Sequence, residues 1–241
     1  MRRAWCGLCG SLTLTVIAWG IVYLLPVADV CGGDAKANPS QEDLAELTVD
    51  WWQWLLGQPA STNPALDMTG AFAHQGQTGD VFFLAGAVAL ADNPFSATVQ
   101  RMVTIPPGKA IFFPILNFEF ANKDTPPGGF TEAQLRAFAA GPLDTATGVH
   151  ATLDGVSLTP RIMRIKSPVF SYTLPRVKKD DLNLYQYLGL DITGRVDGTI
   201  SDGYWVYLPP LSNKTSHILQ FGGSEPTVPF TLNVTYLINV P

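Results

Sequence analysis

The sequence predicts a mainly β fold, a single-domain β-sandwich or jelly roll formed by residues 38–241. Short runs of apolar or alternating residues recur along the chain, and turn residues separate them. The 22 glycines and 19 prolines are spread between these runs, so they mark many short elements and no disordered tract. The regular strand and helix alternation of a doubly wound parallel sheet is absent.

The first 37 residues predict an export signal. Arg2 and Arg3 precede an apolar run over 4–27, and Ala35-Lys36-Ala37 forms a small-x-small cleavage site. We expect cleavage after Ala37 and an extracytoplasmic protein that is periplasmic, secreted or anchored facing outward. Two alternatives stay open, because the apolar run approaches the ~20 residues that span a bilayer. The segment could remain as an uncleaved anchor, the one expected contact with the membrane, or be lipidated at Cys31.

All three cysteines, Cys6, Cys9 and Cys31, lie in this segment. The mature chain then has no thiol for a disulfide, a thiolate metal site or a cysteine nucleophile. The net charge of −5 argues against nucleic acid as a partner, because such binding needs cationic surface. We expect no cofactor and no metal.

The mature chain begins with its clearest helix. Ser40 and Asp43 resemble a capping box, and Gly57 and Pro59 end the pattern. The apolar residues at helical spacing are Leu44, Leu47, Trp51, Trp54 and Leu55. A second apolar stripe follows beside them, so this amphipathic helix should be largely covered. Its tryptophans are expected to be core residues, with Trp52 partly exposed.

The next elements are strands. Nine runs are expected: 81–90, 98–105, 109–120, 149–153, 161–166, 169–174, 203–208, 217–221 and 230–240. Two short helices are expected near 132–140 and 182–188. The last three strands, joined by turns, are similar to the closing strands of an immunoglobulin-like sandwich.

Several segments resemble a group of secreted bacterial proteins of unassigned activity. The two longest are Gly76-Gln77-x-Gly79-x-Val81-Phe82-Phe83-Leu84-Ala85-Gly86 and Ile105-Pro106-Pro107-Gly108-Lys109-Ala110-Ile111-Phe112-Phe113-Pro114-Ile115. The resemblance spans most of the mature chain. It implies an exported bacterial protein and assigns no functional residue.

No complete catalytic motif is present. A serine hydrolase elbow needs Gly-x-Ser-x-Gly, which this sequence does not contain. A His-Glu-x-x-His zinc site needs two histidines four residues apart, whereas His74, His150 and His217 are widely separated. The glycine-rich stretch that contains Asp191, Asp197 and Asp202 is interpreted as hairpin turns.

Two polar features are candidates for a ligand site. An uninterrupted strand over 109–120 would place Ile111, Phe113, Ile115, Asn117 and Glu119 on one face, although Pro114 favours an edge or a bulge. The loop from His74 to Asp80, which includes Gln77, offers groups that donate and accept hydrogen bonds beside flexible backbone. The structural alternatives, which are favoured, are a strand that leaves the core into a solvated loop and a turn whose side chains are already hydrogen-bonded. Trp52 could add an aromatic contact.

These observations favour a secreted or cell-envelope protein that binds a glycan or another surface partner without chemistry. Polysaccharide or another envelope component is the expected partner. The alternative is an extracellular hydrolase or lyase acting on polysaccharide, with Glu119 meeting Asp80 or His74 only in the fold. A third class is a structural subunit of a surface assembly.

Overall fold

The computed structural model describes residues 38–88, 95–122, 129–176, 181–227 and 229–241. The helices are α1 (Gln41–Leu56), α2 (Glu132–Thr145) and α3 (Leu184–Tyr187), with 3-10 turns at Ala60–Thr62 and Thr159–Arg161. The strands are β1 (Val81–Phe83), β2 (Ser96–Thr104), β3 (Ala110–Phe120), β4 (Thr147–Leu153), β5 (Val156–Ser157), β6 (Ile162–Lys166), β7 (Phe170–Thr173), β8 (Arg195–Leu208), β9 (Thr215–Glu225) and β10 (Phe230–Val240). Among the described residues, no helix has the length and hydropathy needed to cross a membrane.

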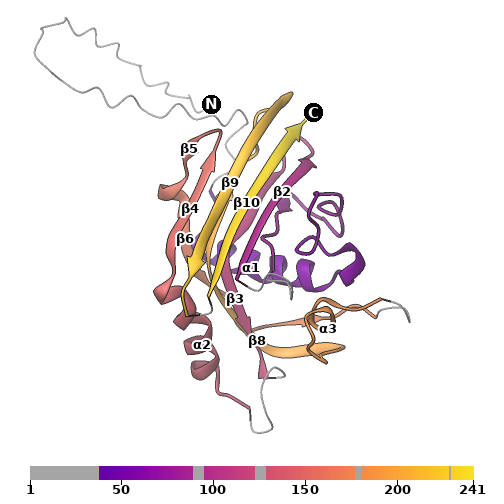
Figure 1. Cartoon of the computed structure of the whole chain (residues 1–241), viewed down its shortest axis with the longest axis vertical. Coiled ribbons are helices and arrows are strands. Elements are labelled where there is room, and N and C mark those ends of the chain that lie inside the picture. Colours follow the sequence, from indigo (N-terminus) through magenta and orange to yellow (C-terminus); the bar gives the residue numbers. More distant parts are fainter. Residues whose placement is uncertain (1–37, 89–94, 123–128, 177–180, 228) are drawn as a thin grey trace, which may run out of the picture.

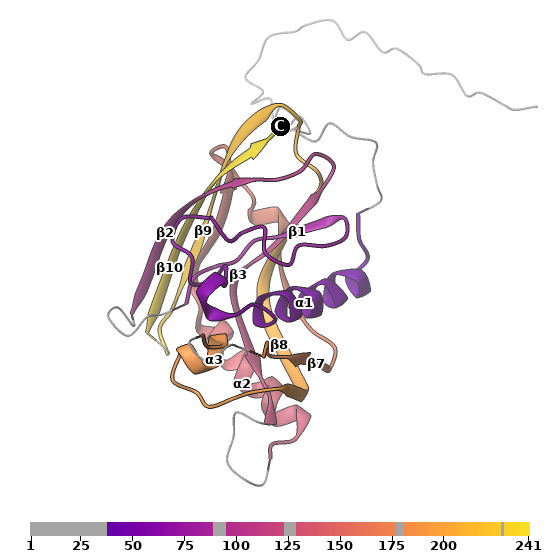
Figure 2. The ribbon, with the colours of Figure 1, turned by 90° about the vertical axis from the view of Figure 1, so that its right-hand side faces the viewer.

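Two mixed sheets form the domain, and the predicted β-sandwich is confirmed (Figures 1 and 2). Sheet 1 has the order β1-β3-β8-β6, and β7 pairs with the first part of β8. Sheet 2 has the order β2-β10-β9-β4-β5. Two pairs, β1 with β3 and β10 with β2, are parallel, and the other pairs are antiparallel.

All nine predicted strand runs contain a strand, and both later helices are present. The run predicted over 81–90 is much shorter, since β1 ends at Phe83. The short β5 was not predicted. The predicted signal segment, residues 1–37 with Cys31, lies outside the described residues.

One apolar core lies between the two sheets. Phe113 and Val206 of sheet 1 are fully buried, and they belong to the same cluster as Phe221 and Tyr236 of sheet 2. The rings of Phe113 and Phe221 lie 4.7 Å apart across the two sheets. Burial of this kind contributes about 25 cal/mol per Å² of apolar area, so this layer holds the sandwich together.

A second core lies between the outer face of sheet 1 and α1. The capping box predicted for this helix is confirmed, with Ser40 and Asp43 bonded reciprocally. Trp205 of β8 stacks on Phe112 at 4.9 Å, and Trp51 of α1 meets Trp205 edge-on at 5.4 Å. The Trp51 indole N–H donates to the Leu84 carbonyl at 2.9 Å. These contacts fix α1 against the sheet.

A bulge at Pro114 changes which way the end of β3 faces. The pairing with β8 shifts between Pro114 and Leu116, as expected for proline in a strand. Ile111 and Phe113 therefore point into the core between the sheets, whereas Asn117 points to the α1 side, where its Cβ lies beside Gly203 and the Trp205 indole. An uninterrupted strand would have kept 111–119 on one face, but the bulge that Pro114 was expected to favour is present, so Asn117 and Glu119 face away from Ile111 and Phe113.

Candidate functional site

An apolar groove of about 380 Å³ lies between α1, the second half of β3 and α3. We call it the α1 groove. Its walls come from several segments of the sequence, from Trp51 to Leu232. The lining residues are Trp51, Trp52, Leu55, Leu56, Ala65, Gly86, Ala87, Val88, Pro114, Ile115, Leu116, Asn117, Phe118, Glu119, Leu184, Tyr185, Leu188, Phe230 and Leu232. Most of these side chains are aliphatic or aromatic, so the groove is an apolar site with a small polar part.

The polar part comes from the end of β3. Asn117 and Glu119 follow each other on one face of the strand, as predicted, and both line the groove. The Asn117 Nδ2 and the Trp52 Nε1 are buried, and neither has a hydrogen-bond partner among the described residues. A buried N–H without an acceptor costs about 1–3 kcal/mol. Two such donors among the lining residues, one from α1 and one from β3, favour an occupant that carries an oxygen atom.

Three predicted site residues, Trp52, Asn117 and Glu119, thus meet at one groove. Trp51, Trp52 and Trp54 are 2%, 8% and 6% exposed, so the prediction that they are core residues is confirmed, and the expectation that Trp52 would be partly exposed was wrong. Its ring lies edge-on to Trp51 at 5.0 Å. The indole face is therefore part of the wall and offers no open platform for stacking.

The other three predicted residues lie elsewhere. Gln77 has a structural role, since its side-chain amide donates to the Ala73 and Phe83 carbonyls and accepts from the Phe83 N–H. The exposed His74 packs edge-on against Phe82 at 5.4 Å. Neither residue lines the α1 groove. The predicted loop and the end of β3 therefore do not form one site.

Asp80 belongs to a second groove of about 410 Å³ on the other side of Trp54. Asp50 and Gln53 of α1 face the loop residues Thr78 and Asp80 there. Burial raises the pKa of Asp50 above its usual value of 3.8. Two exposed acidic residues do not define a metal site, and the described residues contain no cluster of three or more His, Cys, Asp or Glu side chains.

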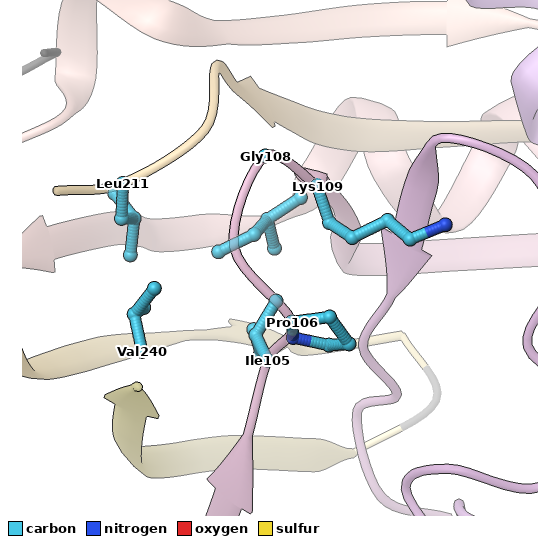
Figure 3. A pocket seen from close by; sticks show the side chains of 7 residues that line it. Ile105, Pro106, Gly108, Lys109, Leu211 and Val240 are labelled. Atoms are coloured by element: carbon cyan, nitrogen blue, oxygen red, sulfur yellow. The ribbon is translucent and has the colours of Figure 1, made fainter. Parts of the chain in front are cut away.

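A third depression lies at one end of the sandwich (Figure 3). Its lining comes from the turn that contains Pro106 and Gly108, with Leu211 and Val240 on the opposite side. Its internal volume is close to 0 Å³, so the side chains already fill it. It is a packing feature and has no room for a ligand.

His217 and Asp202 have structural roles. His217 is buried and contacts the Asp154 carboxylate at 2.7 Å through Nδ1 and the Thr215 hydroxyl at 2.8 Å through Nε2. Asp202 is also buried and pairs with Arg164 at 2.9 Å. Because β8 runs unbroken from Arg195 to Leu208, the expectation that Asp197 and Asp202 lie in hairpin turns was wrong.

Comparisons with protein-family models, curated proteins and solved structures found no match to this chain. The site therefore has to be interpreted from its own geometry.

Sequence reasoning missed the far wall of the α1 groove. Tyr185 and Leu188 come from α3 and its end, and Phe230 opens β10. One signal was available, since Leu182, Leu188 and Leu190 are unusually apolar for a short exposed helix, and all three remain at least 39% exposed. Nothing in the sequence places that helix opposite Trp52.

Proposed function

We propose that the protein is an extracytoplasmic binding protein whose α1 groove takes a small ligand with an apolar body and an oxygen-bearing end. The observation that carries this proposal is the groove itself. Its volume of about 380 Å³ falls in the range of about 300–1,000 Å³ that is typical of small-molecule sites. Aromatic and aliphatic walls favour a ligand with an apolar body, because such surface gains most from leaving water.

The polar end supports the second half of the proposal. The Asn117 amide and the Trp52 indole, both of residues that line the groove, each carry a buried N–H group that has no acceptor among the described residues. A ligand oxygen that reaches this end, after a small side-chain shift, would recover part of the cost of leaving them unpaired. Alcohols, ketones and carboxylic acids with a short hydrocarbon body share this chemistry.

The hydrolase alternative finds less support. It needs Glu119 to act together with Asp80 or His74 on one substrate. Glu119 lines the α1 groove and Asp80 lines the second groove, while His74 lines neither. A pair of carboxylates working on one glycosidic bond must lie within about 10 Å of each other across a common cleft.

A groove-filling variant tests the proposal. Ala87→Phe places a ring in the groove, and Ala137→Phe places the same ring on the exposed side of α2 as a matched control. Binding of N-phenyl-1-naphthylamine to residues 38–241 is followed by fluorescence, and 1-decanol is used as the competitor. We expect Ala87→Phe to bind N-phenyl-1-naphthylamine and 1-decanol about tenfold or more weakly than wild type, equivalent to about 1.4 kcal/mol. The control variant Ala137→Phe should bind both compounds like wild type. Equal binding by all three proteins, or none by wild type, would contradict the proposal.

A further inference from the structure

The outer face of sheet 2 carries no charged strand residue. The strand registers place sixteen side chains on this face. They are Ser96, Thr98, Gln100, Met102, Thr104, Thr231, Asn233, Thr235, Leu237, Asn239, Ser216, Ile218, Gln220, Ser224, His150 and Thr152. None is Asp, Glu, Lys or Arg. The three helices that the structure describes all lie away from this face (Figures 1 and 2).

The absence of charge is unusual for an exposed surface of this size. A surface that is about 25–35% charged is the usual design target for a soluble protein, and it corresponds to about four or five charged side chains among sixteen. The chain itself is not poor in charge, with 20 acidic and 15 basic residues. A face without charge attracts neither anionic nor cationic partners, which points to an uncharged one.

The side chains on this face form regular rows across the strands. Gln100, Thr235, Gln220 and Thr152 are successive register partners on β2, β10, β9 and β4. Neighbouring strands lie about 4.8 Å apart, so these hydroxyl and amide groups stand side by side. Each group both donates and accepts hydrogen bonds. The row therefore offers a line of paired donors and acceptors to a flat partner.

An apolar row runs next to the polar one. Met102, Leu237 and Ile218 are register partners two residues further along the strands. Met102 is 70% exposed and Ile218 is 48% exposed. At about 3.3 Å per residue, the two rows lie roughly 7 Å apart. A sugar ring has the same two-sided chemistry, with hydroxyl groups at its edge and C–H groups on its face.

We propose that the outer face of sheet 2 is a binding surface for a neutral polysaccharide. A second copy of the chain fits less well, because the cores of homodimer interfaces are about 65% apolar. Here three of the sixteen side chains, Met102, Leu237 and Ile218, are large and apolar. A nucleic acid, an acidic polysaccharide or a lipid headgroup would need cationic groups, which this face does not have.

This surface is independent of the α1 groove. Leu232 of β10 lines the groove from the inner side of sheet 2, whereas the polysaccharide face lies on the outer side of that sheet. Polysaccharide binding at this face therefore does not depend on a small ligand in the α1 groove.

The test is retention of residues 38–241 on insoluble polysaccharides. Chitin, cellulose and curdlan are the neutral probes, and alginate gel is the anionic one. Gln220→Lys and Thr98→Lys each place one charge on the face, and either variant suffices if the other folds poorly. Gln75→Lys is the matched control, because it adds the same charge to an exposed loop beside α1. Thermal melts confirm that each protein is folded.

We expect wild type and Gln75→Lys to be retained on at least one neutral polysaccharide, and the two face variants to bind it at least about tenfold more weakly. Three outcomes would overturn the proposal. They are no retention of wild type on any neutral probe, unchanged retention of both folded face variants, or retention on alginate alone. A dimer in light scattering that Gln220→Lys dissociates, without polysaccharide binding, would assign the face to a second copy instead.

Discussion

Replacement of Trp51 by Ala should remove a large part of the stability of the domain. Trp51 is 2% exposed, and its ring contacts three other aromatic rings, those of Trp52, Trp54 and Trp205. Truncation of a buried tryptophan to Ala typically costs about 3–5 kcal/mol. Loss of the bond to the Leu84 carbonyl adds about 1 kcal/mol. The expected loss is therefore about 4–6 kcal/mol out of a typical total of about 5–15 kcal/mol.

Urea denaturation followed by circular dichroism measures this loss. Trp51→Phe is the control, because it keeps an aromatic ring and removes the indole N–H, and we expect it to cost about 1–3 kcal/mol. If Trp51→Ala lowers the free energy of unfolding by less than about 1 kcal/mol, α1 is not docked on sheet 1 as described. The wall of the α1 groove would then be lost with it.

Three further predictions follow from single contacts. Gly222→Ala should destabilise the domain by about 3 kcal/mol or more, because the added Cβ would lie 2.1 Å from the Leu232 carbonyl oxygen. Gly141→Ala in α2 is the control: its Cβ meets nothing within 4 Å, and it should stabilise the domain by about 0.5–1 kcal/mol. Similar melting temperatures for the two variants would refute this prediction. Burial alone would raise the pKa of Asp67, but hydrogen bonds from Phe72 and Thr69 outweigh it and hold the pKa below 3.8. The ionised Asp67 therefore stabilises the folded state fully above the unfolded-state pKa of about 3.9, and this stabilisation is lost as the pH falls through the lower folded-state pKa. Below about pH 4, the free energy of unfolding measured with urea should fall less steeply in Asp67→Asn than in wild type. Identical pH profiles for the two proteins would contradict this prediction. Asn117→Leu should weaken binding of 1-hexanol about five- to tenfold and leave n-hexane binding unchanged, measured by headspace partitioning, and an equal effect on both ligands would remove the role of the amide.

The sequence pattern predicts most elements of this fold. Strand alternation in β2 and β10 sets the inner and outer faces, and the capping box at Ser40 sets the start of α1. These features are local, since each depends on residues within one element. The polar rows on sheet 2 were not predicted, because they depend on the register between strands that are far apart in the chain.

Arg101 shows what a local pattern cannot provide. Strand alternation alone places it inward between Val99 and Val103, which is unexpected for a charged side chain. The structure shows it only 1% exposed, with its guanidinium donating to the Asp67, Ala85 and Gly86 carbonyls and to the Tyr236 hydroxyl. Those acceptors come from three other parts of the chain. Only the tertiary structure explains why the charge is tolerated.

The candidate site also combines local features, which the sequence predicts, with long-range features, which it does not. Asn117 and Glu119 share a face because they are two residues apart on one strand, and this was predictable. The bulge at Pro114 turns them toward α1, and the loop from His74 to Asp80 folds against a different part of that helix. Their separation is a long-range property that spacing in the sequence does not encode.

The most direct test of the account is a crystal structure of residues 38–241 soaked with 1-decanol. The account predicts electron density for the alkyl chain along Trp52, Leu188 and Phe230, with the hydroxyl oxygen within hydrogen-bond distance of Asn117 Nδ2 or Trp52 Nε1. An α1 groove that stays free of alcohol, or that closes by collapse of its walls, would contradict the claim that it is a ligand site.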